Sequence, residues 1–343
     1  MEKLLPVNLI YSNDRFKKPN LHFYQGQELD LTKYNIALIA YDHDSTQSFR
    51  KILYTQQFEF FRNLEILDLG DAYAMSLTEM ADMIQSLIKA DVYPILVGFP
   101  QECILSISNT WENEILPHSI CWVTSIFNKE TFDVLENNIF IKNQYYLGLQ
   151  RQLSTMNIAK SNDQNIKPMY LSEFRKSNQN IDAYTRNSEL FYFNMNAVRF
   201  SDFPASINPS GFFSEEIISI AKLSGSSDRS LLSVISSWNK DIDKNHICNT
   251  LVSQIIWYMI EGYTLKLKDK LAKNKNLSHY VVEVKNSDIH LDFYKSEVSG
   301  KWWIKEPGPD ENYHGSLIPC TYEEYLKTVQ ENLPERLLEL IYH

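Results

Sequence analysis

The stretch Glu189-Leu-Phe-Tyr-Phe-Asn-Met-Asn-Ala-Val-Arg-Phe-Ser-Asp-Phe-Pro204, which continues to Glu216, decides the fold. Its apolar and aromatic run, Leu190 to Phe193, is typical of a buried strand. The run ends at two amides on alternate positions, Asn194 and Asn196. Period-two alternation predicts that both side chains lie on one face at the carboxyl end of the strand, where open α/β sheets bind ligands. Two Asp residues here would deliver paired carboxylates to a metal, whereas this chain delivers neutral amides.

Strand patterns alternate with helix patterns on both sides of this stretch. Ser76-Leu-Thr-Glu79, for example, matches a capping box, in which the Ser and Glu side chains satisfy free backbone N–H groups at the start of a helix. The alternation predicts a three-layer α/β/α sandwich with a mostly parallel sheet. Strands are expected at 36–40, 64–69 (nearer an edge), 93–97, 119–123, 145–149, 190–194 and 231–236, and helices near 46–60, 76–88, 102–113, 177–187, 214–223 and 247–270.

The pattern changes after residue 275, where short strands at 280–284, 289–293 and 301–304 precede a helix at 321–340. The polar stretch 153–168 is expected to be a loop or linker. These shifts predict three parts of the chain: an irregular lead-in over 1–34, an α/β/α domain over 35–272, and a C-terminal extension over 273–343 that packs on the same domain.

The composition indicates a folded, acidic protein. Of 343 residues, 44% are apolar and 13% aromatic, which is ample for a core. The formal net charge of −10 argues against a nucleic-acid partner, because such partners need basic patches. No run approaches the roughly 20 apolar residues of a membrane span, so no membrane insertion is expected. The scattered cysteines are typical of buried, reduced thiols and of a cytoplasmic location; they are Cys103, Cys121, Cys248 and Cys320.

The central stretch resembles a known family signature. Phe193-Asn194-Met195-Asn196-Ala197-Val198-Arg199, followed by Ser201-Asp202-Phe203-Pro204, is similar to the Ser-Phe-Asp-x-Asp signature of the arginase (ureohydrolase) superfamily. The similarity is greatest to the formimidoylglutamase-like branch, whose strand is followed by an Arg-x-Ser-Asp-x-Pro loop. The downstream order is also similar, with Gly211, Gly225 and the Gln254–Gly262 helix in place. The resemblance spans residues 35–263 and implies an arginase-like fold.

The resemblance also implies two divalent cations, usually manganese, that polarise a bridging hydroxide for attack on a guanidinium-type carbon. Such a pair of cations needs several ionised carboxylates to offset the mutual repulsion. The matching positions of this chain carry uncharged side chains, so we expect them to be vestiges of a metal site that holds no metal: Gln101, Thr124, Ile126, Asn128, Asn194 and Asn196, with Ser237 at the vestigial substrate position. Bulky residues should fill the space into a dry site whose amides bond to backbone or to one another; these residues are Phe99, Pro100, Ile126 and Phe127.

Other polar clusters have simpler interpretations. Asp42-His43-Asp44 could bind a cation, but acidic, turn-forming residues at a strand end are more typical of a solvated loop. Asp241 and Asp243 are explained by a turn and a helix N-terminal cap. We expect His118 and Cys121 to pack rather than to act as ligands. Trp302-Trp303 could form a stacking platform beside Lys301 and Lys305, but the favoured interpretation is that they anchor the core of a terminal subdomain.

Three functions stay open at this point. The favoured function is that of a non-catalytic ureohydrolase homologue, a pseudoenzyme that needs no cofactor and serves as a binding or assembly module for a protein partner or within a homo-oligomer. The second is that of a formimidoylglutamase-like or arginase-like hydrolase of C–N bonds in linear amidines, with substitute ligands and manganese. The third is that of a small-molecule sensor that uses the vestigial cleft, and it requires polar groups around a cavity. The missing carboxylates favour the first.

Overall fold

The computed structural model describes residues 3–7, 18–41, 49–110, 118–127, 141–154, 165–176, 181–236, 243, 245–272, 277–284, 290–306, 317–334 and 337–338. Its principal sheet has nine strands in the order β1-β3-β2-β4-β9-β8-β5-β6-β7, and all pairings between them are parallel. The strands are β1 (Leu21–Phe23), β2 (Ile36–Ala40), β3 (Ile66–Asp71), β4 (Tyr93–Val97), β5 (His118–Val123), β6 (Ile141–Leu149), β7 (Ile166–Tyr170), β8 (Leu190–Asn194) and β9 (Leu232–Ser236).

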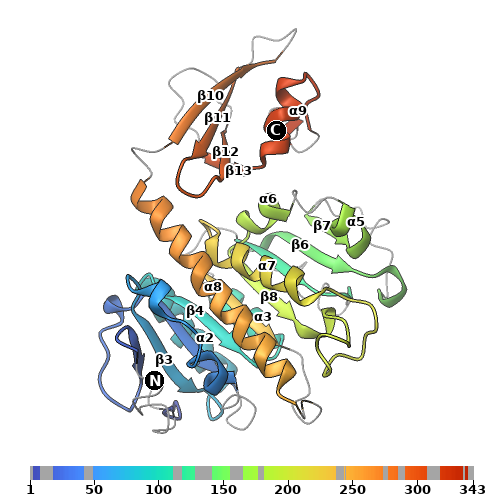
Figure 1. Cartoon of the computed structure of the whole chain (residues 1–343). Helices are drawn as coiled ribbons and strands as arrows, with labels where there is room; N and C mark the ends of the chain where they lie inside the picture. The colour runs from blue at the N-terminus through green and yellow to red at the C-terminus, as the bar shows by residue number, and fades with distance from the viewer. Residues whose placement is uncertain are drawn as a thin grey trace.

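Helices cover both faces of this sheet. Side chains of β2 alternate between two hydrophobic clusters, with Ile36 and Leu38 in one and Ala37 and Ile39 in the other. The first cluster packs under α7 (Ser214–Ser226) and α8 (Ile247–Ala272), which cross the near face of the sheet in Figure 1. The second packs under α2 (Leu77–Lys89) and α3 (Glu102–Thr110). The three-layer α/β/α architecture is therefore confirmed. Shorter helices are α5 (Leu171–Lys176), α6 (Ile181–Arg186), η2 (Leu31–Lys33), η3 (Glu59–Phe61), η4 (Arg151–Leu153) and η7 (Met195–Ala197).

Local signals explain how several of these helices form. The predicted capping box of α2 is present, because Ser76 Oγ accepts from the Glu79 N–H and the Glu79 carboxylate accepts from the Ser76 N–H. Helices α7 and α8 approach each other closely at two glycines. A Cβ atom on Gly225 would overlap the Met259 carbonyl, and one on Gly262 would overlap the Lys222 carbonyl. This close contact fixes the layer that covers β8 and β9.

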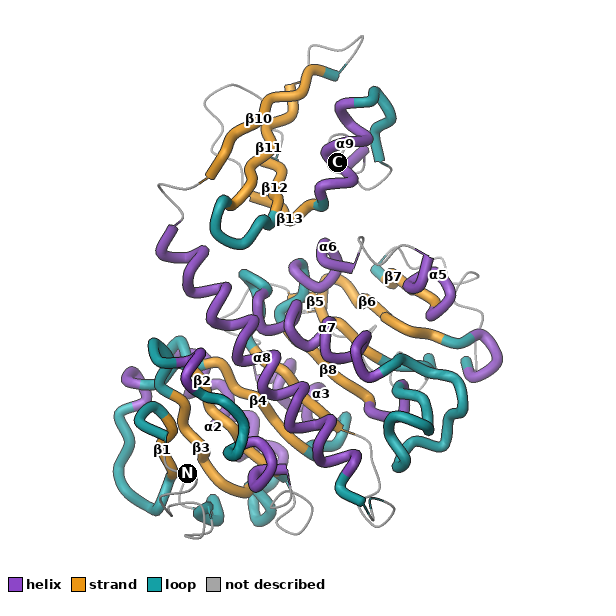
Figure 2. Tube along the Cα trace, in the orientation of Figure 1, coloured by secondary structure: helices purple, strands orange, loops and turns teal. Residues whose placement is uncertain are grey.

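The C-terminal part forms a second, antiparallel sheet with its own core. Its strands run in the order β10 (Leu277–Glu283), β11 (His290–Ser296), β12 (Trp302–Lys305) and β13 (Leu317–Cys320), and α9 (Tyr322–Val329) packs beside them (Figure 2). Trp302 stacks on Tyr325 with ring centroids 4.7 Å apart, and Trp303 is also buried. Trp302 thus anchors this core, as predicted, whereas Trp303 contacts Arg186 and Asp228. This sheet lies beyond the end of α8 in Figure 1.

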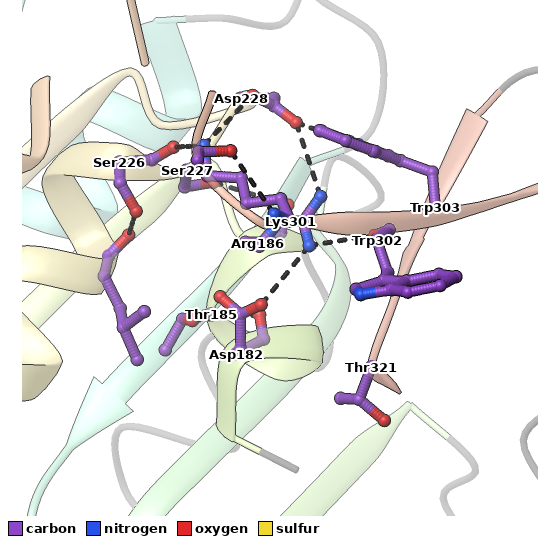
Figure 3. A network of polar contacts seen from close by, with 12 residues as sticks. Asp182, Thr185, Arg186, Ser226, Ser227, Asp228, Lys301, Trp302, Trp303 and Thr321 are labelled. Atoms are coloured by element: carbon purple, nitrogen blue, oxygen red, sulfur yellow. Dashed lines mark hydrogen bonds and ion pairs between the residues drawn. The ribbon is translucent and has the colours of Figure 1, made fainter. Parts of the chain in front are cut away.

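Lys301 attaches this second sheet to the α/β/α part (Figure 3). The side chain of Lys301 is buried, and its Nζ donates to the Ser226 carbonyl at 2.6 Å. The same Nζ forms an ion pair with Asp269 of α8 at 2.9 Å, and Asp269 also accepts from the Ser296 hydroxyl at 2.9 Å. A buried charge is tolerated only when it is paired in this way.

Arg186 forms the second half of the same junction (Figure 3). It is fully buried, and its Nη1 donates to the Trp302 carbonyl at 3.0 Å. Its guanidinium lies over the Trp303 ring, 4.6 Å from the centroid. The Trp303 indole N–H donates in turn to Asp228 at 3.0 Å. Together these contacts join α6, the end of α7 and β12.

The structure corrects some expected elements. The expected irregular lead-in contains the edge strand β1, which pairs with β3. Strand β3 is therefore second from the edge, in agreement with the expectation of a strand nearer an edge, and it is buried along its whole length. A single helix was expected over 46–60. In the described residues of this range, 49–53 form a helix, and the separate short helix η3 begins at Glu59. Strand β7 occupies the end of the expected linker, β13 was not predicted, and α9 ends at Val329. No helix within the described ranges is long and apolar enough to span a membrane.

Candidate functional site

A pocket of about 150 Å³ lies at the carboxyl ends of β5 and β8. It is on the face of the sheet that carries α3, because its aromatic lining belongs to the hydrophobic cluster under α2 and α3. The carboxyl edge of a parallel sheet is the usual place for a ligand site. The lining residues come from four strand ends and are Gln101, Trp122, Thr124, Ile126, Tyr146, Tyr192 and Asn194.

The floor of the pocket is a row of three aromatic side chains on adjacent strands. Trp122 of β5 is paired in register with Tyr146 of β6 and with Tyr192 of β8. The Trp122 and Tyr146 rings are stacked with centroids 6.2 Å apart, and the Trp122 and Tyr192 centroids are 5.3 Å apart. All three side chains are buried. Neighbouring positions across a parallel sheet share a face, and the row follows from that register.

The polar side of the pocket is built from Thr124 and Asn194, which stand two residues after Trp122 and Tyr192, and from Gln101. Thr124 Oγ1 accepts from the Ile126 N–H at 3.2 Å and donates to the Ile126 carbonyl at 3.1 Å. Asn194 Oδ1 accepts from the Asn196 N–H at 3.0 Å and so caps η7. Gln101 precedes α3. Phenols are neutral at pH 7, and burial raises the pKa of Tyr146 further. The described lining is therefore uncharged at neutral pH.

The fold gathers four of the predicted vestigial positions around this pocket, namely Gln101, Thr124, Ile126 and Asn194. Asn196 is not among its lining residues. The prediction that Asn194 and Asn196 share a face is wrong, because β8 ends at Asn194 and η7 begins at the next residue, where period-two alternation no longer applies. Asn128 and Ser237 lie outside the described residues, as do Asp42-His43-Asp44 and Asp241.

The expected dry, filled cleft is only partly correct. Phe99 and Phe127 are fully buried and contact Tyr41 and Tyr146 respectively, with ring centroids 5.4 and 5.0 Å apart. A pocket remains beside them, and Ile126 at its edge is 39% exposed. The expected bond between an amide and the backbone is present at Asn194, whose Oδ1 accepts from the Asn196 N–H.

The remaining candidates have structural roles. Asp243 caps α8, because its carboxylate accepts from the Cys248 and Asn249 N–H groups, each at 3.0 Å. His118 is buried, and burial lowers the pKa of its imidazole to about 4. All four cysteines are buried and free, as predicted, and burial raises the pKa of the Cys103 thiol to about 12.

The donor set at the strand ends does not fit a dinuclear metal centre. Amide and hydroxyl oxygens can coordinate a cation, but they supply no net charge to offset the repulsion between two divalent ions. Within the described part of the chain, no group of three or more His, Cys, Asp or Glu side chains is placed to hold a metal. The aromatic floor also offers no ligand atom suited to such ions.

Comparison with known proteins identifies the fold. No family model matches the sequence, and no curated protein is significantly similar to it. Solved structures do match. A Trypanosoma cruzi formiminoglutamase with manganese is 16% identical with a TM-score of 0.60, over 69% of this chain and 95% of that chain. The proclavaminate amidino hydrolase of Streptomyces clavuligerus is 12% identical with a TM-score of 0.58, over 74% of this chain and 100% of that chain. A hypothetical agmatinase from Burkholderia thailandensis is 11% identical with a TM-score of 0.55, over 70% of this chain and 89% of that chain.

Proposed function

We propose that this chain, which has the fold of the arginase superfamily, is a pseudoenzyme: a non-catalytic ureohydrolase homologue that works as a binding module without a dinuclear metal site. One observation carries the proposal. The four described positions that the resemblance aligns with metal ligands surround a single pocket, and none of them has an ionisable side chain. They are Gln101, Thr124, Ile126 and Asn194.

The chemistry of the pocket supports binding over hydrolysis. Hydrolysis of an amidine by the two-metal route needs a hydroxide nucleophile, which the cations generate by lowering the pKa of a bound water. Among the described residues, the lining has no carboxylate or imidazole to hold those cations or to act as a general base in their place. What it offers is apolar ring surface beside amide groups, which is the usual composition of a small-molecule site.

An activity screen tests the proposal. The purified chain, with manganese, cobalt or zinc added, should release neither urea nor formamide from guanidino or formimino substrates above a heat-killed control. Metal content measured by mass spectrometry should be well below one ion per chain. Metal-dependent turnover would instead support an amidine hydrolase with substitute ligands.

The partner of such a module is a separate proposal. We propose that the chain contacts a protein partner or a second copy of itself. Light scattering of the purified protein tests the second possibility, and a monomeric mass at all accessible concentrations would contradict it.

A further inference from the structure

We propose that the pocket binds a small, neutral, planar ring molecule that carries a hydrogen-bond acceptor, such as a cyclic amide, an aromatic amide or a neutral nitrogen heterocycle. The inference rests on the proposed function, because it takes the strand-end pocket to be a binding site. It goes beyond it by naming the class of ligand.

Size and shape come first. The pocket has a volume of about 150 Å³, and a cavity of this size accommodates a molecule the size of benzene. Its floor is the row formed by Tyr146, Trp122 and Tyr192. A flat ring gains the most contact with such a row, and aromatic rings have favourable offset or edge geometries with one another. A planar ligand with one ring therefore fits best.

The charge of the ligand follows from the lining. Every described lining side chain is an amide, an alcohol, a phenol, an indole or an aliphatic group. A charged molecule that enters such a site loses hydration without gaining an opposite charge. The pocket therefore favours a neutral ligand.

The polarity of the ligand follows from the orientation of Asn194. Its Oδ1 accepts from the Asn196 N–H, so the amide oxygen is fixed toward the backbone. The Nδ2 group carries two N–H donors, and no hydrogen bond from it to another described residue is observed. A second donor, the indole N–H of Trp122, is buried and has no hydrogen-bond partner among the residues that the structure describes. Unpaired donors favour a ligand that presents a carbonyl oxygen or a ring nitrogen.

This polarity excludes one class of ligand. A guanidinium or amidinium group has donors only and no acceptor, and it carries a charge. It cannot accept from Asn194 Nδ2, so the pocket should discriminate against cationic amidines. Replacing Asn194 by Asp reverses this preference, because the carboxylate keeps an oxygen for the Asn196 N–H and presents a charged acceptor where Nδ2 was.

Benzamide and benzamidinium form a matched pair of probes for the full-length chain. They have the same shape, but benzamide is neutral with a carbonyl acceptor, whereas benzamidinium is a cation with donors only. Binding is measured by calorimetry and by saturation-transfer NMR at pH 7. We expect benzamide to bind at least about tenfold more tightly, which is the discrimination of one hydrogen bond to a charged or mispaired group. In Asn194→Asp the order should reverse.

The control is Asn196→Asp, which makes the same chemical change at a position outside the pocket lining and should leave the preference for benzamide unchanged. Circular dichroism confirms that both variants fold. Tighter binding of benzamidinium by the unmodified chain, binding of neither probe, or the same preference in Asn194→Asp would each overturn the ligand class. None of these results produces metal-dependent turnover, so the proposed function is judged separately by the activity screen.

Discussion

Replacing Lys301 by Met should weaken the attachment of the C-terminal sheet more than any exposed substitution in the same sheet. The methionine keeps the length of the apolar stem but removes the ammonium group that donates to the Ser226 carbonyl and pairs with Asp269. Asp269, which is 4% exposed, would then be a buried carboxylate with the Ser296 hydroxyl as its remaining described partner. Loss of one partner from a buried ion pair costs about 3–5 kcal/mol of unfolding free energy.

Urea unfolding followed by tryptophan fluorescence measures this loss, since Trp302 and Trp303 lie in the affected sheet. Lys295→Met is the control, because its partial ion pair with Glu297 spans 4.0 Å at the surface and should contribute no more than about 1 kcal/mol. Adding Asp269→Asn to Lys301→Met should recover part of the loss, because the uncompensated charge is gone. If Lys301→Met costs no more than Lys295→Met, the buried junction does not hold the two sheets together.

Three further outcomes follow from local contacts. Burial lowers the pKa of His118 from 6.5 to about 4, so protonation of the imidazole in the unfolded chain lowers the unfolding free energy as the pH falls from 6.5 to about 4. Between pH 7 and pH 4 the unfolding free energy of the unmodified chain should fall by up to about 3 kcal/mol more than that of His118→Asn. Parallel plots of unfolding free energy against pH for the two proteins would contradict this. Asn194→Ala removes the side-chain cap of η7 and should lower the unfolding free energy measured by chemical denaturation by about 1 kcal/mol. The control Asn196→Ala should change this free energy by less than about 0.5 kcal/mol. Equal effects of the two substitutions would argue against the capping role of Asn194. Gly262→Ala should lower the melting temperature by several degrees, because the new methyl group overlaps the Lys222 carbonyl, whereas Thr264→Ala on the same helix should have a smaller effect; an unchanged melting temperature for Gly262→Ala would mean that the helices can separate freely.

Several interior strands could be predicted from sequence because they are mainly apolar runs, as in β2, β4 and β8. Strands β2, β4, β8 and β9 all lie within a residue or two of the expected ranges. The strands that were missed, β1, β7 and β13, are all edge strands. Two of them contain a proline, Pro168 and Pro319, which removes a ladder hydrogen bond and is tolerated at an edge. Such segments carry no strong periodic signal.

The site was predictable only where it depends on residues next to each other in sequence. The uncharged strand ends could be identified from the motif positions, of which four line the pocket. The floor could not, because it depends on the lateral order β8-β5-β6, which brings Tyr192, Trp122 and Tyr146 together from distant parts of the chain. The position of Asn196 was wrong because alternation was extended past the last residue of β8.

The most direct test of the central claim is the melting temperature of the chelated protein as manganese is added. A ligand at a hundred times its dissociation constant stabilises the native state by about 2.7 kcal/mol, which shifts the melting temperature by several degrees. Because the described residues that line the pocket carry amides, an alcohol, an aliphatic group and aromatic rings in place of carboxylates, millimolar manganese should leave the melting temperature unchanged. A rise of several degrees that saturates with manganese and disappears in Asn194→Ala would show that the site binds metal, and it would contradict the pseudoenzyme proposal.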